Sequence, residues 1–194
     1  MTQSFRFRQL CWFAAFAAWP ALSQTPQKAT EPVWTTYRNY RWGFCIDYPS
    51  NWVGFNEGFN KAGMSVSHSP ERPVIVELGA GALANQPHGL KANNIDDNTP
   101  MTLEENVNDF LDIFGKKAQV LVRERTVFAG TPAFHVKVRH TDADGEWISE
   151  YIQMLVRGAV YDVNLRVRPK LYQEYEPVFR RFKSTFRLNC VPLR

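Results

Sequence analysis

The side chains that could carry out chemistry are few and scattered along the chain. His135 and His140 are five residues apart in a segment that alternates like a strand, so they face opposite sides and cannot form a metal-binding pair. His68 and His88 fall at a strand end and in a loop. The sequence contains no G-x-S-x-G, P-loop, strand-linked G-x-G-x-x-G or H-E-x-x-H motif. We therefore assign no catalytic residue, no metal ligand and no cofactor.

One acidic cluster faintly resembles a calcium-binding loop. Asp142, Asp144 and Glu146 surround Gly145, but the twelve-residue pattern of an EF-hand is absent. Aspartate and glycine are also the residues that a tight turn favours, because they tolerate its backbone angles. The cluster therefore predicts a hairpin turn.

A polar face on a sheet is the stronger candidate for a functional surface. Three late segments alternate polar and apolar residues, and we expect their polar side chains to share one side. The candidate binding residues are His135, Lys137, Arg139, Tyr151, Asp162 and Arg166. Such a face could bind a partner or a small ligand. The alternative is ordinary cross-strand pairing of the basic side chains with acids.

Three strands must position these residues. The alternation predicts strands over residues 134–139, 147–156 and 160–167. The turn at 142–145 and the Arg157-Gly158 link are too short for crossovers, so the strands are antiparallel neighbours.

Two helices are expected beside this sheet. Thr102 and Glu105 form a capping-box pattern, and apolar residues recur at helical spacing from there to Gly115. Near the C-terminus, a short turn at Pro169 precedes a second helix. We place its start near Pro177, since proline has no amide to donate inside a helix.

The remaining pattern completes an α+β fold. It predicts further strands over residues 40–48, 64–68, 73–78, 118–123 and 125–128. Residues 79–100 show no periodicity and predict a long loop that is either functional or disordered. The fold class is an antiparallel sheet of six to seven strands sandwiched by helices.

The first residues predict export. Arg6 and Arg8 precede an apolar run over residues 10–22, and a small-residue site favours cleavage after Ser23. We expect a signal peptide over residues 1–23, a linker over 24–36 and a single domain over 37–194, in the periplasm or outside the cell. An uncleaved anchor is the alternative, although the run is short for a membrane span.

Charge gives little support for nucleic-acid binding. Two of the 23 basic residues and none of the 19 acidic residues lie in residues 1–23, so cleavage lowers the net charge from +4 to +2. A mild excess of this kind does not indicate a nucleic-acid partner.

Cleavage also changes the cysteine count. Cys11 is removed, and Cys45 and Cys190 remain as an even pair. In an oxidising compartment this pair predicts one disulfide that closes nearly the whole domain. The alternative is two buried, unpaired thiols.

Four segments together resemble the PsbP/Mog1 group. They are the opening G-F-x-I-x-Y-P-x-x-W over residues 43–52, the A-G-T-P-A turn over 129–133, the Y-D-V strand over 161–163 and the closing P-x-F-x-x-F-x-S-x-F over 177–186. The resemblance covers about residues 37–188 and implies an antiparallel sheet sandwiched by helices. The group includes extrinsic photosystem II subunits, a Ran-binding nuclear protein and small exported bacterial proteins, and it shares no catalytic motif.

The functional expectation follows from these points. We expect an exported, non-enzymatic binding or assembly-support domain that acts through its surface on an unidentified protein partner, without nucleic acid and without membrane integration after cleavage. The alternative is a hydrolase or metal-dependent enzyme whose site lies between the 79–100 loop and the polar sheet face. A third possibility is a purely structural envelope protein.

Overall fold

The computed structural model describes residues 32–58, 61–68, 76–86 and 99–192. These residues belong to one compact unit, Pro32–Arg194. The expected signal peptide, the linker residues 24–31 and most of the expected loop lie outside the described residues. Within the described residues, no helix is long and apolar enough to cross a membrane.

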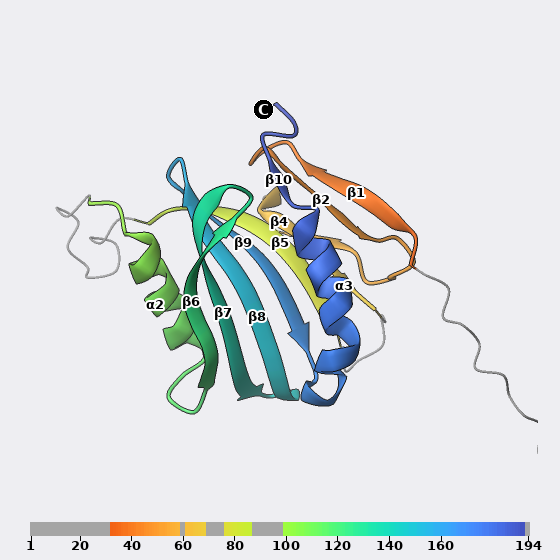
Figure 1. The fold of residues 1–194 in the computed structure, drawn as a ribbon, viewed down its shortest axis with the longest axis vertical. Coiled ribbons are helices and arrows are strands. Elements are labelled where there is room, and N and C mark those ends of the chain that lie inside the picture. Colours follow the sequence, from red (N-terminus) through yellow and green to blue (C-terminus); the bar gives the residue numbers. More distant parts are fainter. Residues whose placement is uncertain (1–31, 59–60, 69–75, 87–98, 193–194) are drawn as a thin grey trace, which may run out of the picture. The chain divides into compact units, whose positions relative to one another are not determined.

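The described residues of this unit form two antiparallel sheets and two α-helices (Figure 1). The larger sheet has the order β3-β4-β5-β9-β8-β7-β6, and the smaller has the order β1-β2-β10. The strands of the larger sheet are β3 Asn56–Glu57, β4 Gly63–Ser67, β5 Val76–Ala84, β6 Gln119–Phe128, β7 Thr131–Asp142, β8 Gly145–Val156 and β9 Ala159–Val167. Those of the smaller are β1 Trp34–Asn39, β2 Phe44–Pro49 and β10 Arg187–Leu188. The expected α+β architecture is confirmed.

The helices cover opposite faces of the larger sheet. Helix α3, Tyr172–Ser184, packs on the main core, where the alternating residues Tyr161, Val163 and Leu165 of β9 are buried. Helix α2, Leu103–Ile113, packs on a second apolar cluster built around Val136 of β7. The period-two alternation of each strand supplies an apolar side for each helix.

Helix α2 begins as its capping pattern predicts. The Thr102 hydroxyl accepts a hydrogen bond from the Glu105 amide at 3.2 Å, and the Glu105 carboxylate accepts one from the Thr102 amide at 2.7 Å. These bonds pair two donors that the first turn of a helix leaves free.

Helix α3 corrects the prediction made from Pro177. The helix begins at Tyr172, directly after the short 3₁₀-helix η2 over Pro169–Leu171, and Pro177 lies inside it. Pro177 is exposed, so the carbonyl one turn earlier can be solvated. Burial of Tyr175, Phe179 and Phe182 along one stripe holds the helix together across the proline.

The expected long loop is also corrected. Strand β5 runs on to Ala84, so residues 79–84 belong to the centre of the larger sheet. Residues 79–82 are alternating glycines and alanines, which hide the strand because they lack the branched and aromatic side chains that mark one. Similarly, the two segments expected at 118–128 form one strand, β6, with a bulge between Val120 and Val122.

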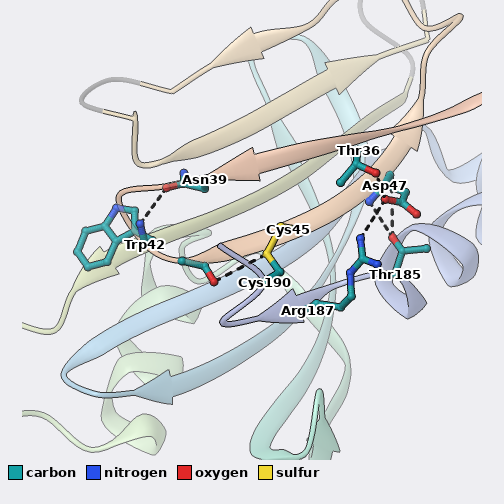
Figure 2. Close-up of a disulfide and its surroundings, with 9 residues drawn as sticks. Thr36, Asn39, Trp42, Cys45, Asp47, Thr185, Arg187 and Cys190 are labelled. Atoms are coloured by element: carbon teal, nitrogen blue, oxygen red, sulfur yellow. Dashed lines mark hydrogen bonds and ion pairs between the residues drawn. A yellow bond between two sulfur atoms is a disulfide. The ribbon is translucent and has the colours of Figure 1, made fainter. Parts of the chain in front are cut away.

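The smaller sheet joins the two ends of the unit. Strand β1 begins at Trp34, so the last three residues of the expected linker are part of a strand. Strand β2 pairs with β1 on one side and with β10 on the other. The Cys45–Cys190 disulfide links β2 to the segment after β10, as predicted, with the two Cα atoms 6.0 Å apart (Figure 2).

Polar contacts around Asp47 reinforce this junction. The Asp47 carboxylate accepts hydrogen bonds from the Thr36 hydroxyl at 2.7 Å and from the Arg187 guanidinium at 3.4 Å (Figure 2). Its backbone amide donates to the Thr185 hydroxyl at 2.9 Å. One residue of β2 is therefore bonded to β1, to the end of α3 and to β10.

Candidate functional site

The six candidate binding residues do not form one surface. His135, Lys137 and Arg139 of β7 share a face with Ile152, Glu150 and Ile148 of β8, their direct partners. That face is covered by α3. The candidates Tyr151, Asp162 and Arg166 lie on the opposite face, toward α2. The expectation of a single polar face is therefore wrong.

The hairpin turn explains the division. Asp142 pairs with Gly145 across a two-residue turn, so each odd-numbered residue of β7 pairs with an even-numbered residue of β8. Because paired residues point to the same side of a sheet, the odd-numbered residues of the two strands face opposite sides. The same rule keeps Tyr151 and Asp162 together, since Tyr151 pairs with Asn164 and Gln153 pairs with Asp162.

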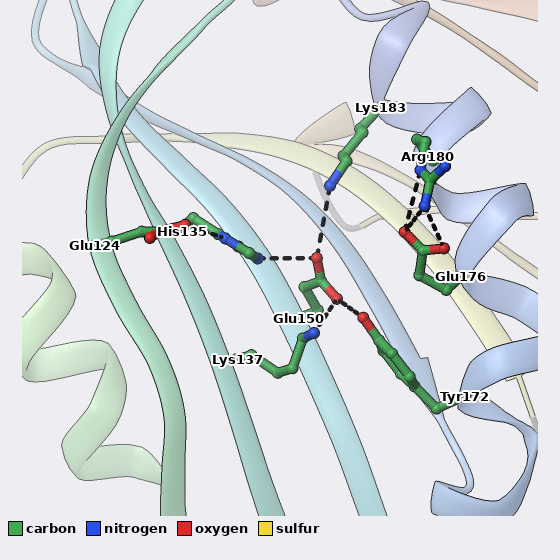
Figure 3. Close-up of polar contacts among 8 residues, drawn as sticks. All are labelled: Glu124, His135, Lys137, Glu150, Tyr172, Glu176, Arg180 and Lys183. Atoms are coloured by element: carbon green, nitrogen blue, oxygen red, sulfur yellow. Dashed lines mark hydrogen bonds and ion pairs between the residues drawn. The ribbon is translucent and has the colours of Figure 1, made fainter.

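On the α3 side, His135 and Lys137 contact a buried carboxylate that sequence reasoning overlooked, whereas Arg139 is exposed and its Nε lies 3.8 Å from a Glu146 carboxylate oxygen. Glu150 is 3% exposed. His135 Nε2 lies 2.9 Å from its Oε1, and the Tyr172 hydroxyl donates to its Oε2 (Figure 3). The ammonium groups of Lys137 and Lys183 lie 3.4 and 3.6 Å from the carboxylate oxygens.

Electrostatics show that this cluster holds Glu150 as an anion. Burial opposes the charge, but the hydrogen bonds from His135 and Tyr172 and the nearby lysines outweigh it and lower the pKa of Glu150 to about 2. The hydrogen bond to Glu150 raises the pKa of His135, against the opposite effect of burial. The cluster thus joins β7, β8 and α3 through one buried charge, and its geometry is that of a structural ion-pair network.

On the α2 side, Arg166 and Tyr151 are held by neighbours. The Arg166 guanidinium donates to the Asp142 carboxylate and lies 3.9 Å from the ring centre of Trp147. The ring of Tyr151 packs against Phe110 of α2 with centroids 4.4 Å apart. Burial raises the pKa of Tyr151 to about 12. Both side chains fix the hairpin and α2 in place.

Asp162 has a different environment. It lies beside the glycines of β5, where Gly81 is its direct partner, and it accepts a hydrogen bond from Asn164 at 2.7 Å. A side chain on Gly79 would collide with Asn164, so glycine leaves the space that these polar groups occupy. Burial raises the pKa of Asp162. A shallow hollow of about 240 Å³ lies over this part of the sheet.

An adjoining cavity of about 700 Å³ lies between the sheet and α2. The two hollows share Ala62 and Leu83 as lining residues. The apolar lining of the cavity comes mainly from β5, the start and face of α2, and β9, and includes Leu83, Ala84, Met101, Phe110, Ile113 and Val160. Its volume lies in the range typical of small-molecule sites, about 300–1,000 Å³.

Two hydrogen bonds involve Asn106 and Met101 of the cavity lining. The Asn106 amide group of α2 donates to the Asn85 side chain at 2.9 Å, and the Asn85 side chain donates to the Met101 carbonyl at 2.7 Å. The end of β5 is thereby joined to the beginning of α2. Ile113 and Leu83 line the cavity and are 79% and 63% exposed. The cavity therefore has an apolar, solvent-facing rim.

Two residues that line the cavity each carry a polar atom that is buried from solvent and has no hydrogen-bond partner among the described residues. The atoms are Oε1 of Gln153, whose residue is 6% exposed, and Nε1 of Trp42. Most buried polar atoms in proteins are paired. The sequence could not single out these two residues, because their significance depends on burial in the folded chain.

The histidines are accounted for by local contacts. His140 hydrogen-bonds to Ser149 at 2.9 Å, and His68 packs edge-on against Trp52 and Tyr175. His88 lies outside the described residues. In the part of the chain that the structure describes, no three His, Cys, Asp or Glu side chains are grouped to hold a metal ion.

Comparison with solved structures identifies the fold. The chain is similar to cyanobacterial PsbP (CyanoP) from Synechocystis sp. PCC 6803, with a TM-score of 0.57 and 13% identity over 83% of this chain and 95% of that one. This likeness confirms the expected PsbP/Mog1-like fold, and at this identity it shows the fold alone.

Two weaker likenesses have TM-scores below 0.5. LpqN of Mycobacterium tuberculosis, involved in cell envelope biogenesis, has a TM-score of 0.49 and 10% identity over 81% of this chain and 91% of that one. PA94 of Pseudomonas aeruginosa, a protein of unknown function, has a TM-score of 0.43 and 15% identity over 76% of this chain and 91% of that one. No family model and no curated protein matches the chain.

Proposed function

We propose that this protein is an exported, non-enzymatic binding domain and that the cavity between α2 and the larger sheet is its binding site. The observation that carries the proposal is the apolar lining of a 700 Å³ cavity whose rim exposes Ile113 and Leu83. Exposed apolar side chains around a hollow favour occupation by an apolar group, because occupation removes their surface from water.

The position of the cavity also bears on the enzymatic alternative. The cavity lies where that alternative placed its site, between the region after β5 and the sheet face of Gln153. Its polar lining includes the amides of Gln86, Asn106 and Gln153, the carboxylate of Asp109 and the guanidinium of Arg41. Amides orient a ligand by hydrogen bonds, so this lining favours a binding function.

Export is supported by two independent features. Residues 1–23 have the pattern of a cleavable signal peptide. The Cys45–Cys190 disulfide fits an oxidising compartment, since such bonds rarely persist in the cytosol. Production of the full chain in a bacterial host should yield a periplasmic protein beginning at Gln24. A full-length cytoplasmic product would contradict export.

The binding site is tested with an apolar fluorescent probe, N-phenyl-1-naphthylamine. The mature protein should increase its fluorescence saturably, and Ile113→Asp should weaken binding about tenfold by placing a charge at the apolar rim. Val53→Asp is the matched control, because Val53 is 60% exposed and does not line the cavity. Equal binding by the two variants, or no binding by the unmodified protein, would overturn the proposal.

A further inference from the structure

We infer that the ligand of the cavity between α2 and the larger sheet is an anionic amphiphile, an apolar chain with a carboxylate or phosphate head. This inference rests on the proposed function, since it names the chemistry of the molecule that the cavity takes. It is drawn from a second hollow, lined by three basic side chains, that adjoins the cavity.

The second hollow, which we call the basic hollow, has a volume of about 530 Å³ and is lined by Arg38, Asn39, Tyr40, Arg41, Glu57 and Lys61. Its three basic residues are exposed to solvent, so a molecule that enters the hollow can reach them. They outnumber the one carboxylate of the lining, that of Glu57, which accepts a hydrogen bond from the Tyr37 hydroxyl at 3.0 Å. An excess of positive charge in a hollow favours an oxyanion as its occupant.

Arg41 joins the basic hollow to the apolar cavity, because it lines both. The consecutive residues Lys61 and Ala62 form a second junction, since Lys61 lines the basic hollow and Ala62 lines the cavity. A chain that lies in the cavity can therefore carry a head group that lies in the basic hollow.

The buried side chain of Asn39 holds the two hollows in a fixed relation. Asn39 is 2% exposed, and its Nδ2 donates to the Lys61 carbonyl at 2.9 Å, while its Oδ1 accepts from the Trp42 amide at 2.9 Å. Lys61 belongs to the basic hollow, and Trp42 belongs to the cavity lining. A site that is held in place before binding loses less entropy when its ligand enters.

The basic hollow also has cations that carry no ion pair within the described part of the chain. There, neither Arg38 nor Lys61 is paired with a carboxylate. By contrast, Arg180 lines a hollow beside α3, but its guanidinium is already paired with Glu176 at 2.7 Å. An oxyanion in the basic hollow does not have to displace such a partner.

The cavity lining determines where the two parts of the ligand lie. Met101, Phe110 and Val160 present apolar surface, which favours a hydrocarbon chain. Asp109 of α2 also lines the cavity, and its carboxylate repels an anion there. The head group is therefore favoured in the basic hollow, where guanidinium groups match the paired oxygens of a carboxylate or phosphate.

The test compares ligands that share a ten-carbon chain and differ in the charge of the head. Decanoate and decyl phosphate are anionic at about pH 7, whereas methyl decanoate is uncharged. Each is titrated, below the concentration at which it forms micelles, against the mature protein loaded with N-phenyl-1-naphthylamine, and displacement of the probe gives its affinity. We expect the anion with the matching head to bind about tenfold more tightly than the ester, as for one charge-assisted hydrogen bond. Which anion binds more tightly distinguishes a carboxylate head from a phosphate head.

A pair of double variants assigns the preference to the basic hollow. Arg38→Gln combined with Lys61→Gln removes two of its three charges, so the preference should fall from about tenfold to about twofold while the affinity for the ester is unchanged. Lys116→Gln combined with Lys170→Gln is the control, because it removes the same net charge from exposed residues that line neither hollow. This control should keep the full preference. Unchanged binding of the ester verifies that the cavity of each variant is intact.

Salt provides a measurement that needs no variant. The preference for the anion should shrink as the ionic strength rises from about 0.01 M to about 1 M, because salt screens exposed charges. A preference that does not depend on salt would contradict a head group bound by these cations.

The outcomes separate this inference from the function on which it rests. Equal affinities of the ester and both anions for the unmodified protein would overturn the inference and leave the binding function standing. A preference as large in the Arg38 and Lys61 double variant as in its control would overturn the role of the basic hollow. Failure of the probe and of all three ligands to bind would overturn the proposed function itself.

Discussion

Gln153 on β8 and Asp162 on β9 are direct cross-strand partners, so their side chains lie together on the sheet face toward α2. Gln153 lines the larger cavity, and Asp162 lines the adjoining hollow. One strand pair therefore supplies polar groups to both. This arrangement places the candidate site on the strands of the sheet, which hold side chains more rigidly than loops do.

Loss of the buried carboxylate on the other face should destabilise the domain. Glu150→Ala leaves His135, Tyr172 and two lysines without their common partner, and we expect unfolding to become easier by about 3 kcal/mol. Urea unfolding of the mature protein measures the change. Glu176→Ala is the control, because it removes only an exposed pair with Arg180 on α3 and should leave the midpoint unchanged (Figure 3). Similar midpoints for both variants would contradict the role of Glu150.

Acid should weaken the fold through the same residue. The pKa of Glu150 is about 2 in the folded protein, below its ordinary value of 4.5. The contribution of ionised Glu150 to the free energy of unfolding is therefore fully present above pH 4.5 and is lost as the pH falls toward 2. Urea midpoints measured from pH 6 to 2 should fall less steeply for Glu150→Gln than for the unmodified protein. Parallel profiles would show that Glu150 is not held as an anion.

Protonated His135 should make the stability of the fold depend on pH in the opposite direction, at higher pH than Glu150 does. The pKa of His135 is raised in the folded protein. Its contribution to the free energy of unfolding is therefore fully present below pH 6.5, and is lost as the pH rises through the pKa of the folded protein. The unmodified protein should lose stability over that range relative to His135→Gln. A histidine proton resonance followed by NMR would give the pKa directly, and a value below 6.5 would contradict the prediction.

Several elements could be predicted from sequence because their signals are local. The capping box at Thr102 and Glu105 and the tight turn at 142–145 both need only neighbouring residues. The start of α3 could not be located, since burial of its apolar stripe outweighs the effect of Pro177. Strand β5 could not be recognised past Leu78. Its glycines leave room for the Asn164 and Asp162 side chains of β9, and this contact is visible only in the folded structure.

The candidate site was less accessible to sequence reasoning. Alternation within β7 and within β8 does not say which residues of the two strands share a face, because the turn between them pairs odd-numbered residues of β7 with even-numbered residues of β8. Counting pairs outward from Asp142 and Gly145 would have separated His135 from Tyr151. The cavity itself depends on how far α2 lies from β5 and β9, and a one-dimensional pattern holds no information on that distance.

Removal of the disulfide should cost stability without changing the fold. The bond closes a loop of 145 residues, and we expect Cys45→Ser with Cys190→Ser to lower the free energy of unfolding by about 3–5 kcal/mol. Urea unfolding of the mature protein measures this. Titration of the unfolded, unreduced mature protein should detect no free thiol, and two free thiols would contradict the bond.

The most direct test of the proposed binding site is an NMR titration of the mature protein with N-phenyl-1-naphthylamine, followed through its indole N–H resonances. We predict that the Trp42 resonance, assigned with Trp42→Phe, shifts saturably, because Trp42 lines the cavity that the probe should occupy. The Trp147 resonance should stay in place, because its Nε1 already donates to Asp142 at 3.0 Å and it does not line the cavity. An unchanged Trp42 resonance at saturating N-phenyl-1-naphthylamine would contradict the assignment of this cavity as the binding site.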